Sequence, residues 1–170
     1  MSSSERSMRR RALLAAAATL ALASCGFQLR GEAAFQFESV YVNAPGHPAF
    51  ATELRRTLAT SGNARLAEAP EKAQAVLAIT SIVDDKQVLS LSPGGRVQEY
   101  VLTKVAVFRV HDSDGREWLK QDEIVVRRAY TYDDTERLAR EIQEQRLLRD
   151  MQTDAVLQIV RRLQAARPPA

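Results

Sequence analysis

Three long segments with the composition of β-strands follow one another in the middle of the chain, and only short turns separate them. The segments span residues 75–91, 97–111 and 117–132 and are rich in the β-branched and aromatic residues that favour strands. The connections 92–95 and 112–115 read SPGG and DSDG, which are typical turn sequences. Strands joined by such short turns pair as antiparallel neighbours. The chain is therefore constrained to an antiparallel meander.

The alternation of side chains assigns one face of this meander to the protein core. Successive strand residues point to opposite faces, so residues two apart share a face. In the second segment the apolar residues of this face are Tyr100, Leu102, Ala106, Phe108 and Val110. In the first segment, Leu77, Ile79 and Val83 are expected to share a face.

The opposite face of the meander is also largely apolar. It carries Val101, Val105 and Val107 in the second segment, and Val125 and Ala129 in the third. An antiparallel strand with one solvated face should alternate apolar with polar residues. Either the high β-propensity of valine explains these residues, or this face docks on a partner, with Val101, Val105 and Val107 in the interface.

A short strand and a helix are predicted before the meander. Residues 35–42 alternate as a strand does, and residues 43–46 form a turn. Pro48 suits the first turn of a helix, and Gly62 would end it. The apolar face of this helix consists of Phe50, Leu54 and Leu58.

A long helix over residues 135–166 is predicted to follow the meander, with Asp133 and Glu136 at the spacing of a capping box. Its apolar stripe comprises Leu148, Met151, Ala155, Val156, Ile159, Val160 and Leu163. The order β-α-β-β-β-α indicates an α+β fold, a two-layer sandwich with two helices on one face of a four-stranded, mostly antiparallel sheet. This single domain would span residues 35–166, with 167–170 as a C-terminal tail.

The first 24 residues have the pattern of a secretory signal. An apolar run over residues 12–23 ends in small residues. The basic residues before it are Arg6, Arg9, Arg10 and Arg11. The run is shorter than the roughly 20 apolar residues that span a bilayer. Residues 1–24 are therefore predicted to be a signal peptide.

The one cysteine of the chain, Cys25, follows this signal directly. The sequence Leu22-Ala23-Ser24-Cys25 resembles the bacterial lipobox, which implies cleavage before Cys25 and lipid attachment to it. The alternative is an ordinary signal followed by a free cysteine, although a lone thiol would be a reactive liability in an exported protein. Acyl chains anchor firmly, since each buried methylene adds about 0.8 kcal/mol. Residues 25–34 would then form a lipidated tether.

The formal net charge of +3 belongs to the signal peptide. Residues 1–24 contain four arginines and one glutamate, so the count of basic residues falls from 24 to 20 without them, and the count of acidic residues falls from 21 to 20. The remaining chain is formally neutral. This balance gives no support to nucleic-acid binding.

Catalytic and metal-binding motifs are not apparent in the sequence. The two histidines, His47 and His111, have no His or Cys partners at metal-ligand spacing. Residues 112–115 are too short for an EF-hand loop, and residues 93–95 are better explained as a turn than as a phosphate loop. The sequence therefore predicts a protein that is not an enzyme and needs neither metal nor cofactor.

Three motifs together resemble the LptE family of lipopolysaccharide-assembly lipoproteins. They are CGFQLRG at residues 25–31, QEY at 98–100 and QIVRRL at 158–163. The resemblance implies an outer-membrane lipoprotein that sits as a plug in the lumen of the large β-barrel LptD. It also implies lipopolysaccharide binding and assistance in barrel assembly. Gly26 is compatible with this location, because many lipoproteins retained at the inner membrane have Asp at that position.

The resemblance also indicates which cations would contact the lipid A phosphates. Arginine binds phosphate in a bidentate geometry, and Arg140 falls where the family has a basic residue. In the hairpin tip the nearest charge is Arg96. Alternatively, Arg140 is a solvated helix residue paired with Glu136 or Glu144, and Arg96 is only an edge charge beside a turn.

Arg127 and Arg128 are weaker candidates for this contact. Adjacent strand residues point to opposite faces, so at most one of them can join a given patch.

A lipid-carrier or envelope-maintenance lipoprotein that acts without a barrel is the main alternative function. It would share the lipobox and the α+β domain. A carrier should enclose an apolar cavity for acyl chains, whereas a plug should have a solid core and an apolar outer face.

Overall fold

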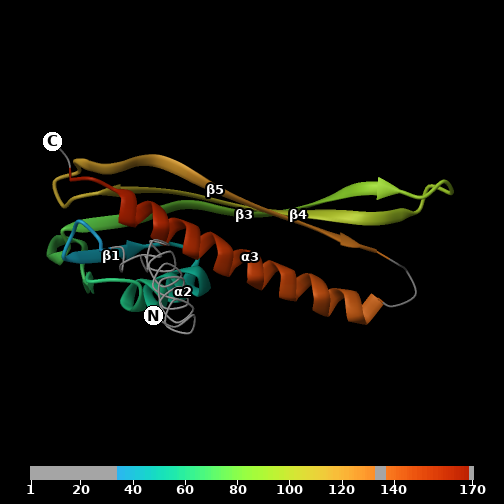
Figure 1. Ribbon diagram of the computed structural model, residues 1–170, viewed down its shortest axis with the longest axis horizontal. Coiled ribbons are helices and arrows are strands. Elements are labelled where there is room, and N and C mark those ends of the chain that lie inside the picture. Colours follow the sequence, from blue (N-terminus) through green and yellow to red (C-terminus); the bar gives the residue numbers. More distant parts are fainter. Residues whose placement is uncertain (1–33, 133–136, 169–170) are drawn as a thin grey trace, which may run out of the picture. The chain divides into compact units, whose positions relative to one another are not determined.

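A mixed β-sheet forms one layer of the protein, and two helices form the other (Figure 1). The computed structural model describes residues 34–132 and 137–168. The described sheet has five strands in the order β2-β1-β3-β4-β5. The elements are β1 Ser39–Asn43, α2 Pro48–Thr60, β2 Arg65–Leu66, a 3₁₀ turn at Pro70–Lys72, β3 Ala75–Leu91, β4 Val97–His111, β5 Glu117–Thr131 and α3 Arg137–Ala165.

The antiparallel meander is confirmed, and the bounds of its strands lie within one residue of the predicted ones. Both predicted turns close in the same way. The Ser92 and Asp112 amides each donate to a carbonyl four residues later, on Arg96 and Arg116. Gly95 and Gly115 have φ near +80° (77° and 85°), a conformation that glycine adopts without steric cost.

The predicted number of strands was wrong by one. β2 is a two-residue strand at the edge of the sheet, where it pairs with β1 in parallel. β1 in turn pairs in parallel with β3, which makes the sheet mixed. β1 also begins at Ser39, four residues later than predicted, although Phe35 and Phe37 before it are buried and the Phe37 ring meets Trp118 edge-on at 5.7 Å.

A β-bulge corrects the predicted position of Val83. The register between β3 and β4 shifts between Ile79 and Ser81. An inserted residue reverses which side chains face the core from that point onward. Leu77 and Ile79 are therefore buried in the core, whereas Val83 lies on the opposite face and is 51% exposed.

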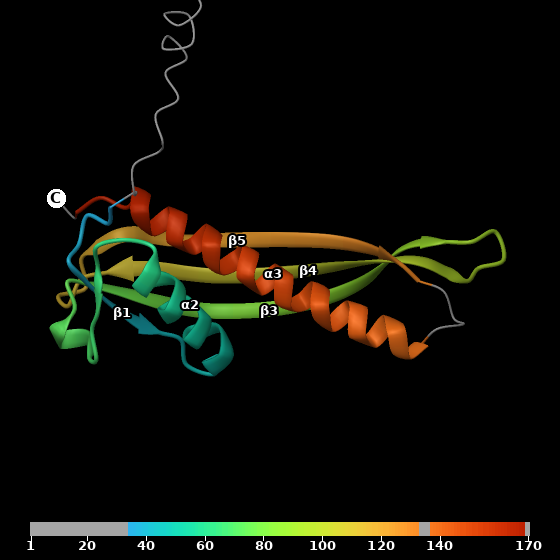
Figure 2. The same cartoon turned by 60° about the horizontal axis from the view of Figure 1, so that its bottom comes forward.

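Both helices cover the same face of the sheet (Figure 2), as predicted. One continuous core joins them to the sheet, and Pro48 begins α2 as expected. The predicted stripe of α3 is buried from Met151 to Leu163, and Leu148 is partly buried at its end. In β4 the core face is the predicted one, with Leu102, Ala106, Phe108 and Val110 between 0% and 1% exposed.

The β3–β4 hairpin extends past the end of β5 (Figure 1). β5 ends at Thr131, which pairs with Glu99, whereas β3 and β4 continue to the pair Leu91–Val97. Leu89 and Leu91 in this extension are 53% and 56% exposed.

The predicted signal peptide, Cys25 and the predicted capping box at Asp133 and Glu136 lie outside the described residues. Within the described residues, no helix combines the length and the apolar character needed to cross a membrane.

Candidate functional site

The three valines predicted to meet a partner lie on the sheet face opposite the helices. We call this face, formed by the outward side chains of β3, β4 and β5, the open face. Val101, Val105 and Val107 are half-buried there, because the outward side chains of β3 and β5 flank them. No described helix covers this face (Figures 1 and 2).

A row of three valines crosses the centre of the open face. Val105 pairs with Val83 on one side and with Val125 on the other. Directly opposed residues of neighbouring strands have their side chains about 5 Å apart, so the three form one continuous apolar patch. Val83 is 51% exposed and Val125 is 40% exposed. The row Asp85–Thr103–Arg127 on one side of the patch is polar, and the row Ser81–Val107–Glu123 on the other side places Val107 between two polar residues.

A second group of side chains gathers on the helix-covered face, where α3 begins. We call it the tyrosine–cation cluster; its members are Lys86, Tyr100, Tyr130, Tyr132, Arg140 and Glu144. The rings of Tyr100 and Tyr130 stack with their centroids 5.8 Å apart, and Tyr132 meets Tyr100 edge-on at 5.1 Å. The Lys86 Nζ lies 4.4 Å from the centre of the Tyr100 ring, and the Arg140 guanidinium lies 5.2 Å from that of Tyr132.

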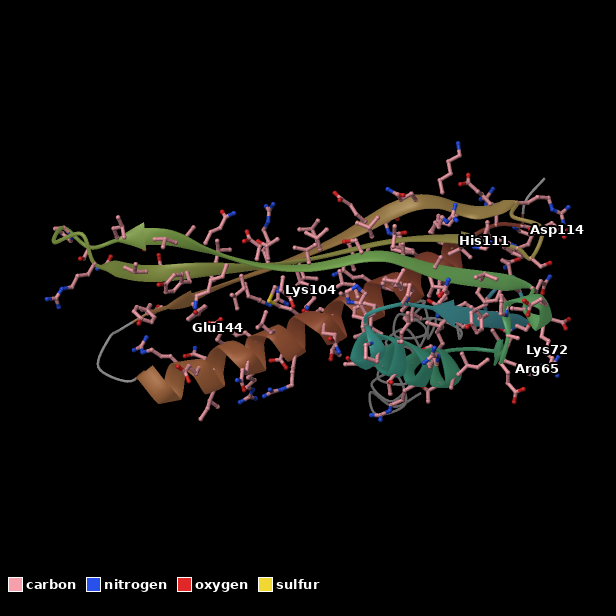
Figure 3. The ribbon with its side chains drawn as sticks, turned by 180° about the vertical axis from the view of Figure 1, so that it is seen from behind. Arg65, Lys72, Lys104, His111, Asp114 and Glu144 are labelled. Atoms are coloured by element: carbon pink, nitrogen blue, oxygen red, sulfur yellow. The ribbon has the colours of Figure 1, made fainter. Side chains whose placement is uncertain are left out.

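Glu144 links α3 to the sheet within this cluster. Its Oε2 atom accepts hydrogen bonds from Lys86 Nζ and from the Tyr130 hydroxyl, both at 2.5 Å. Figure 3 shows Glu144 in the layer between α3 and the strands. A single carboxylate oxygen of α3 is thereby bonded to two of the three long strands, β3 and β5.

These contacts shift the ionisation of all three groups. Burial alone would lower the pKa of Lys86, but hydrogen bonds with Glu144 and Tyr130 outweigh burial and raise it. Burial alone would raise the pKa of Glu144, but hydrogen bonds from Lys86 and Tyr130 outweigh it and lower that pKa. The pKa of Tyr130 is raised, by burial first and by its bond to Glu144 second. At neutral pH the cluster therefore holds a charged ammonium beside a charged carboxylate.

The structure places Arg140 in this cluster and Arg96 at the hairpin tip. Arg140 donates from NH1 to the Thr131 carbonyl at 3.3 Å, at the end of β5. Arg96 closes the turn through its backbone, and its side chain is exposed. The Tyr132 amide donates to the Gln98 carbonyl at 2.7 Å. This bond links Tyr132, on whose ring Arg140 packs, to the strand that follows Arg96.

The structure also places most of the other charged residues that the sequence analysis considered around the phosphate site. Glu144 is bonded to Lys86 and Tyr130, and Glu136 lies outside the described residues. Arg127 and Arg128 point to opposite faces, as expected. Arg128 forms an ion pair with Asp154 of α3 on the helix-covered face, and Arg127 borders the valine row on the open face.

One lysine is buried in the core beneath α3. Lys104 is 3% exposed and its Nζ lies 2.5 Å from Asp84 Oδ1, on the neighbouring strand β3. Figure 3 shows Lys104 between the sheet and α3. A buried ammonium needs such a partner, because an unpaired charge is costly in an apolar environment.

Asp84→Asn is therefore expected to lower the free energy of unfolding by about 2 kcal/mol, since it leaves the Lys104 ammonium buried without a counter-charge. Lys104→Met should change it by less than about 1 kcal/mol, because an apolar side chain fits the same layer. Asp85→Asn on the open face is the matched control. Urea unfolding of the three variants measures these differences, and equal losses for Asp84→Asn and Asp85→Asn would show that Asp84 does not stabilise the buried Lys104 ammonium.

Sequence analysis missed both the tyrosine–cation cluster and the Lys104–Asp84 pair. The signal that could have found them is the hairpin register. Counting seven residues back from Leu91 and seven forward from Val97 brings Asp84 opposite Lys104. The same counting around the second turn brings Tyr100 close to its true partner, Tyr130.

The two histidines do not come together in a reactive site. His47 precedes α2, and His111 ends β4 with its Nδ1 2.7 Å from the Asp112 carbonyl. Within residues 34–132 and 137–168, no group of three or more His, Cys, Asp or Glu side chains is placed to hold a metal ion.

Comparison with known proteins places this arrangement in a family. The family model for LptE, described as lipopolysaccharide-assembly, matches residues 37–163. Comparison with curated proteins gives no match. A solved structure of an uncharacterized lipoprotein B from Nitrosomonas europaea is 35% identical in sequence, with a TM-score of 0.73 over 82% of this chain and 91% of that one.

Two more solved structures share the fold at lower identity. Rare lipoprotein B from Shewanella oneidensis is 23% identical, with a TM-score of 0.66 over 75% of this chain and 94% of that one. A minor lipoprotein from Acinetobacter baumannii is 22% identical, with a TM-score of 0.65 over 79% of this chain and 99% of that one. On the family match and the 35% identity to the first structure, this chain belongs to the LptE family of lipopolysaccharide-assembly proteins.

Proposed function

We propose that this protein plugs the LptD β-barrel, helps to assemble it, and binds lipopolysaccharide during insertion into the outer leaflet of the outer membrane. Membership of the LptE family supports the broader role, since the family is one of non-enzymatic lipopolysaccharide-assembly proteins that work with LptD. Association with the outer membrane accords with the lipoprotein names of the similar structures. The proposal also includes lipid attachment at Cys25 and a position inside the lumen of the barrel.

The observation that carries the plug proposal is the valine row on the open face. A domain that works alone would place polar residues on a sheet face that no helix covers. Here Val83, Val105 and Val125 form an apolar patch bordered by charged residues. An apolar centre with a polar rim is the usual anatomy of a protein–protein interface. The proposed partner of this patch is the inner wall of the barrel.

The packing of the domain favours a plug over a carrier. The core side chains of α2, α3 and the sheet form one cluster of buried residues. A surface hollow of about 610 Å³ along α2 is open, and polar residues such as Glu53, Arg56 and Thr57 help to line it. An acyl-chain carrier would instead need a cavity that encloses the chains.

Arg140 and Arg96 are the proposed contacts for the lipid A phosphates. Reversing both charges, with Arg140→Glu and Arg96→Glu together, is expected to weaken lipopolysaccharide binding on the order of tenfold or more, because two charge-assisted contacts are lost. Capture of the barrel should not change, since neither residue lies in the valine row. Binding of labelled lipopolysaccharide to the purified protein measures the first effect and co-purification of LptD the second. Unchanged binding would remove both arginines from the site.

A further inference from the structure

The tyrosine–cation cluster holds two cations in a connected arrangement. The Lys86 ammonium packs on Tyr100, the Arg140 guanidinium packs on Tyr132, and these two rings are in edge-on contact at 5.1 Å. Lys86 comes from β3 and Arg140 from α3. Ring contacts of this kind restrict the long side chains and fix where their charges lie. Lys86 is therefore connected, through the rings of Tyr100 and Tyr132, to one of the two arginines that we propose for phosphate binding.

Glu144 occupies the position at Lys86 that an anionic ligand would take. Its Oε2 atom accepts from both Lys86 Nζ and the Tyr130 hydroxyl at 2.5 Å. A phosphate oxygen can accept the same two hydrogen bonds. The Lys86 and Glu144 side chains are 38% and 26% exposed, so a ligand can reach the pair from solvent.

Glu144 can leave this position without disruption of the apolar core. The second half of α3, from Met151 onward, is held by buried residues such as Val156 and Ile159. Nearer its start, Leu147 and Leu148 are only partly buried against the core, and Arg140 and Glu144 bond to the sheet through polar groups. Segments held mainly by exposed polar contacts open locally at a lower free energy than the core does.

We infer that Lys86 is a further phosphate-binding residue of the lipopolysaccharide site, and that Glu144 is its internal competitor, displaced when a phosphate-bearing lipid binds. This inference rests on the proposed lipopolysaccharide binding and extends it to a residue on β3. A phosphate can bind Lys86 only in the fraction of molecules in which Glu144 has moved away from it. The apparent affinity is reduced by that fraction.

The test titrates the full acylated protein in mild detergent with diphosphoryl lipid A. Glu144→Gln keeps the shape of the side chain and removes its charge, so binding should tighten by roughly tenfold, the value of about one charge-assisted hydrogen bond. Lys86→Met should weaken binding by a similar factor. In the double variant the gain from Glu144→Gln should disappear, because its target Lys86 is absent. A purely structural role for Glu144 would lower affinity instead.

Matched controls separate this effect from a general change in charge. Glu141→Gln is the control for Glu144→Gln, on an exposed residue of α3. Lys120→Met is the control for Lys86→Met, on an exposed residue of β5. Neither control should alter binding by more than about twofold. If Glu144→Gln does not fold, as judged by its thermal unfolding, Glu144→Asp draws the carboxylate back from Lys86 and should still tighten binding.

The lipid probes identify what Lys86 recognises. With lipid A stripped of its phosphates, the gain from Glu144→Gln should vanish; a persistent gain would overturn the inference. Inorganic phosphate at the same concentration should not compete, and full competition would show a free-phosphate site instead.

The variants also separate this inference from the proposed function. If the wild type binds lipid A, loses binding with Arg140→Glu, and gains none with Glu144→Gln, then the inference fails and the proposed function stands. If the wild type does not bind lipid A, both fail.

Discussion

Val105→Arg is expected to reduce the amount of LptD that co-purifies with this protein by at least an order of magnitude. Val105 is the central residue of the valine row, between Val83 and Val125. An arginine there would bring an unpaired charge into the apolar centre of the proposed interface, which costs several kcal/mol. The isolated domain should remain folded, because the Val105 side chain points away from the core and is only half-buried.

Ala59→Arg is the matched control for this variant. Ala59 is an exposed residue of α2 in the other layer, so the same side chain is added far from the valine row. Quantitative co-purification, with the circular dichroism of each variant, measures both effects. If Val105→Arg keeps its barrel but unfolds the domain, the open face is part of the core and is not an interface.

Phe108→Ala is expected to lower the free energy of unfolding by about 3–5 kcal/mol. Phe108 is fully buried on the core face of β4, in the cluster of buried residues that joins both helices to the sheet. Truncation removes apolar contacts and leaves a cavity that the neighbouring side chains fill only in part. This loss is a large fraction of the 5–15 kcal/mol that is typical of a whole domain.

The neighbouring residue provides the control for Phe108. Val107→Ala truncates a half-buried residue of the open face and should cost about 1 kcal/mol or less. Urea unfolding of both variants gives the two free energies. Similar losses at the two positions would mean that the faces of β4 do not differ in burial as described.

The long strands could be predicted from sequence because their signals are local. Alternation of side chains and the turns at residues 92–95 and 112–115 specify β3, β4 and β5 without knowledge of the rest of the chain. β2 could not be predicted, since two residues carry no periodicity and its pairing with β1 depends on tertiary structure. The bulge after Ile79 was missed for a similar reason, because one inserted residue leaves the composition of a strand unchanged.

The candidate site was less predictable than the fold. The half-buried positions of Val101, Val105 and Val107 follow from alternation within one strand. The tyrosine–cation cluster instead depends on the register of two hairpins and on where α3 crosses them. Arg140 was selected through family resemblance, whereas its contact with Tyr132 is visible only in three dimensions. Lys86 and Glu144 are 58 residues apart in sequence, and neither has a local signal for the other.

The most direct test of the plug proposal is a mild-detergent pull-down of the acylated protein from its own outer membranes, with every co-purified component identified by mass. We expect a large β-barrel, LptD, at one copy per copy of this protein. Recovery of the protein alone, carrying only lipid, would contradict the plug proposal and favour a lipid carrier that acts without a barrel.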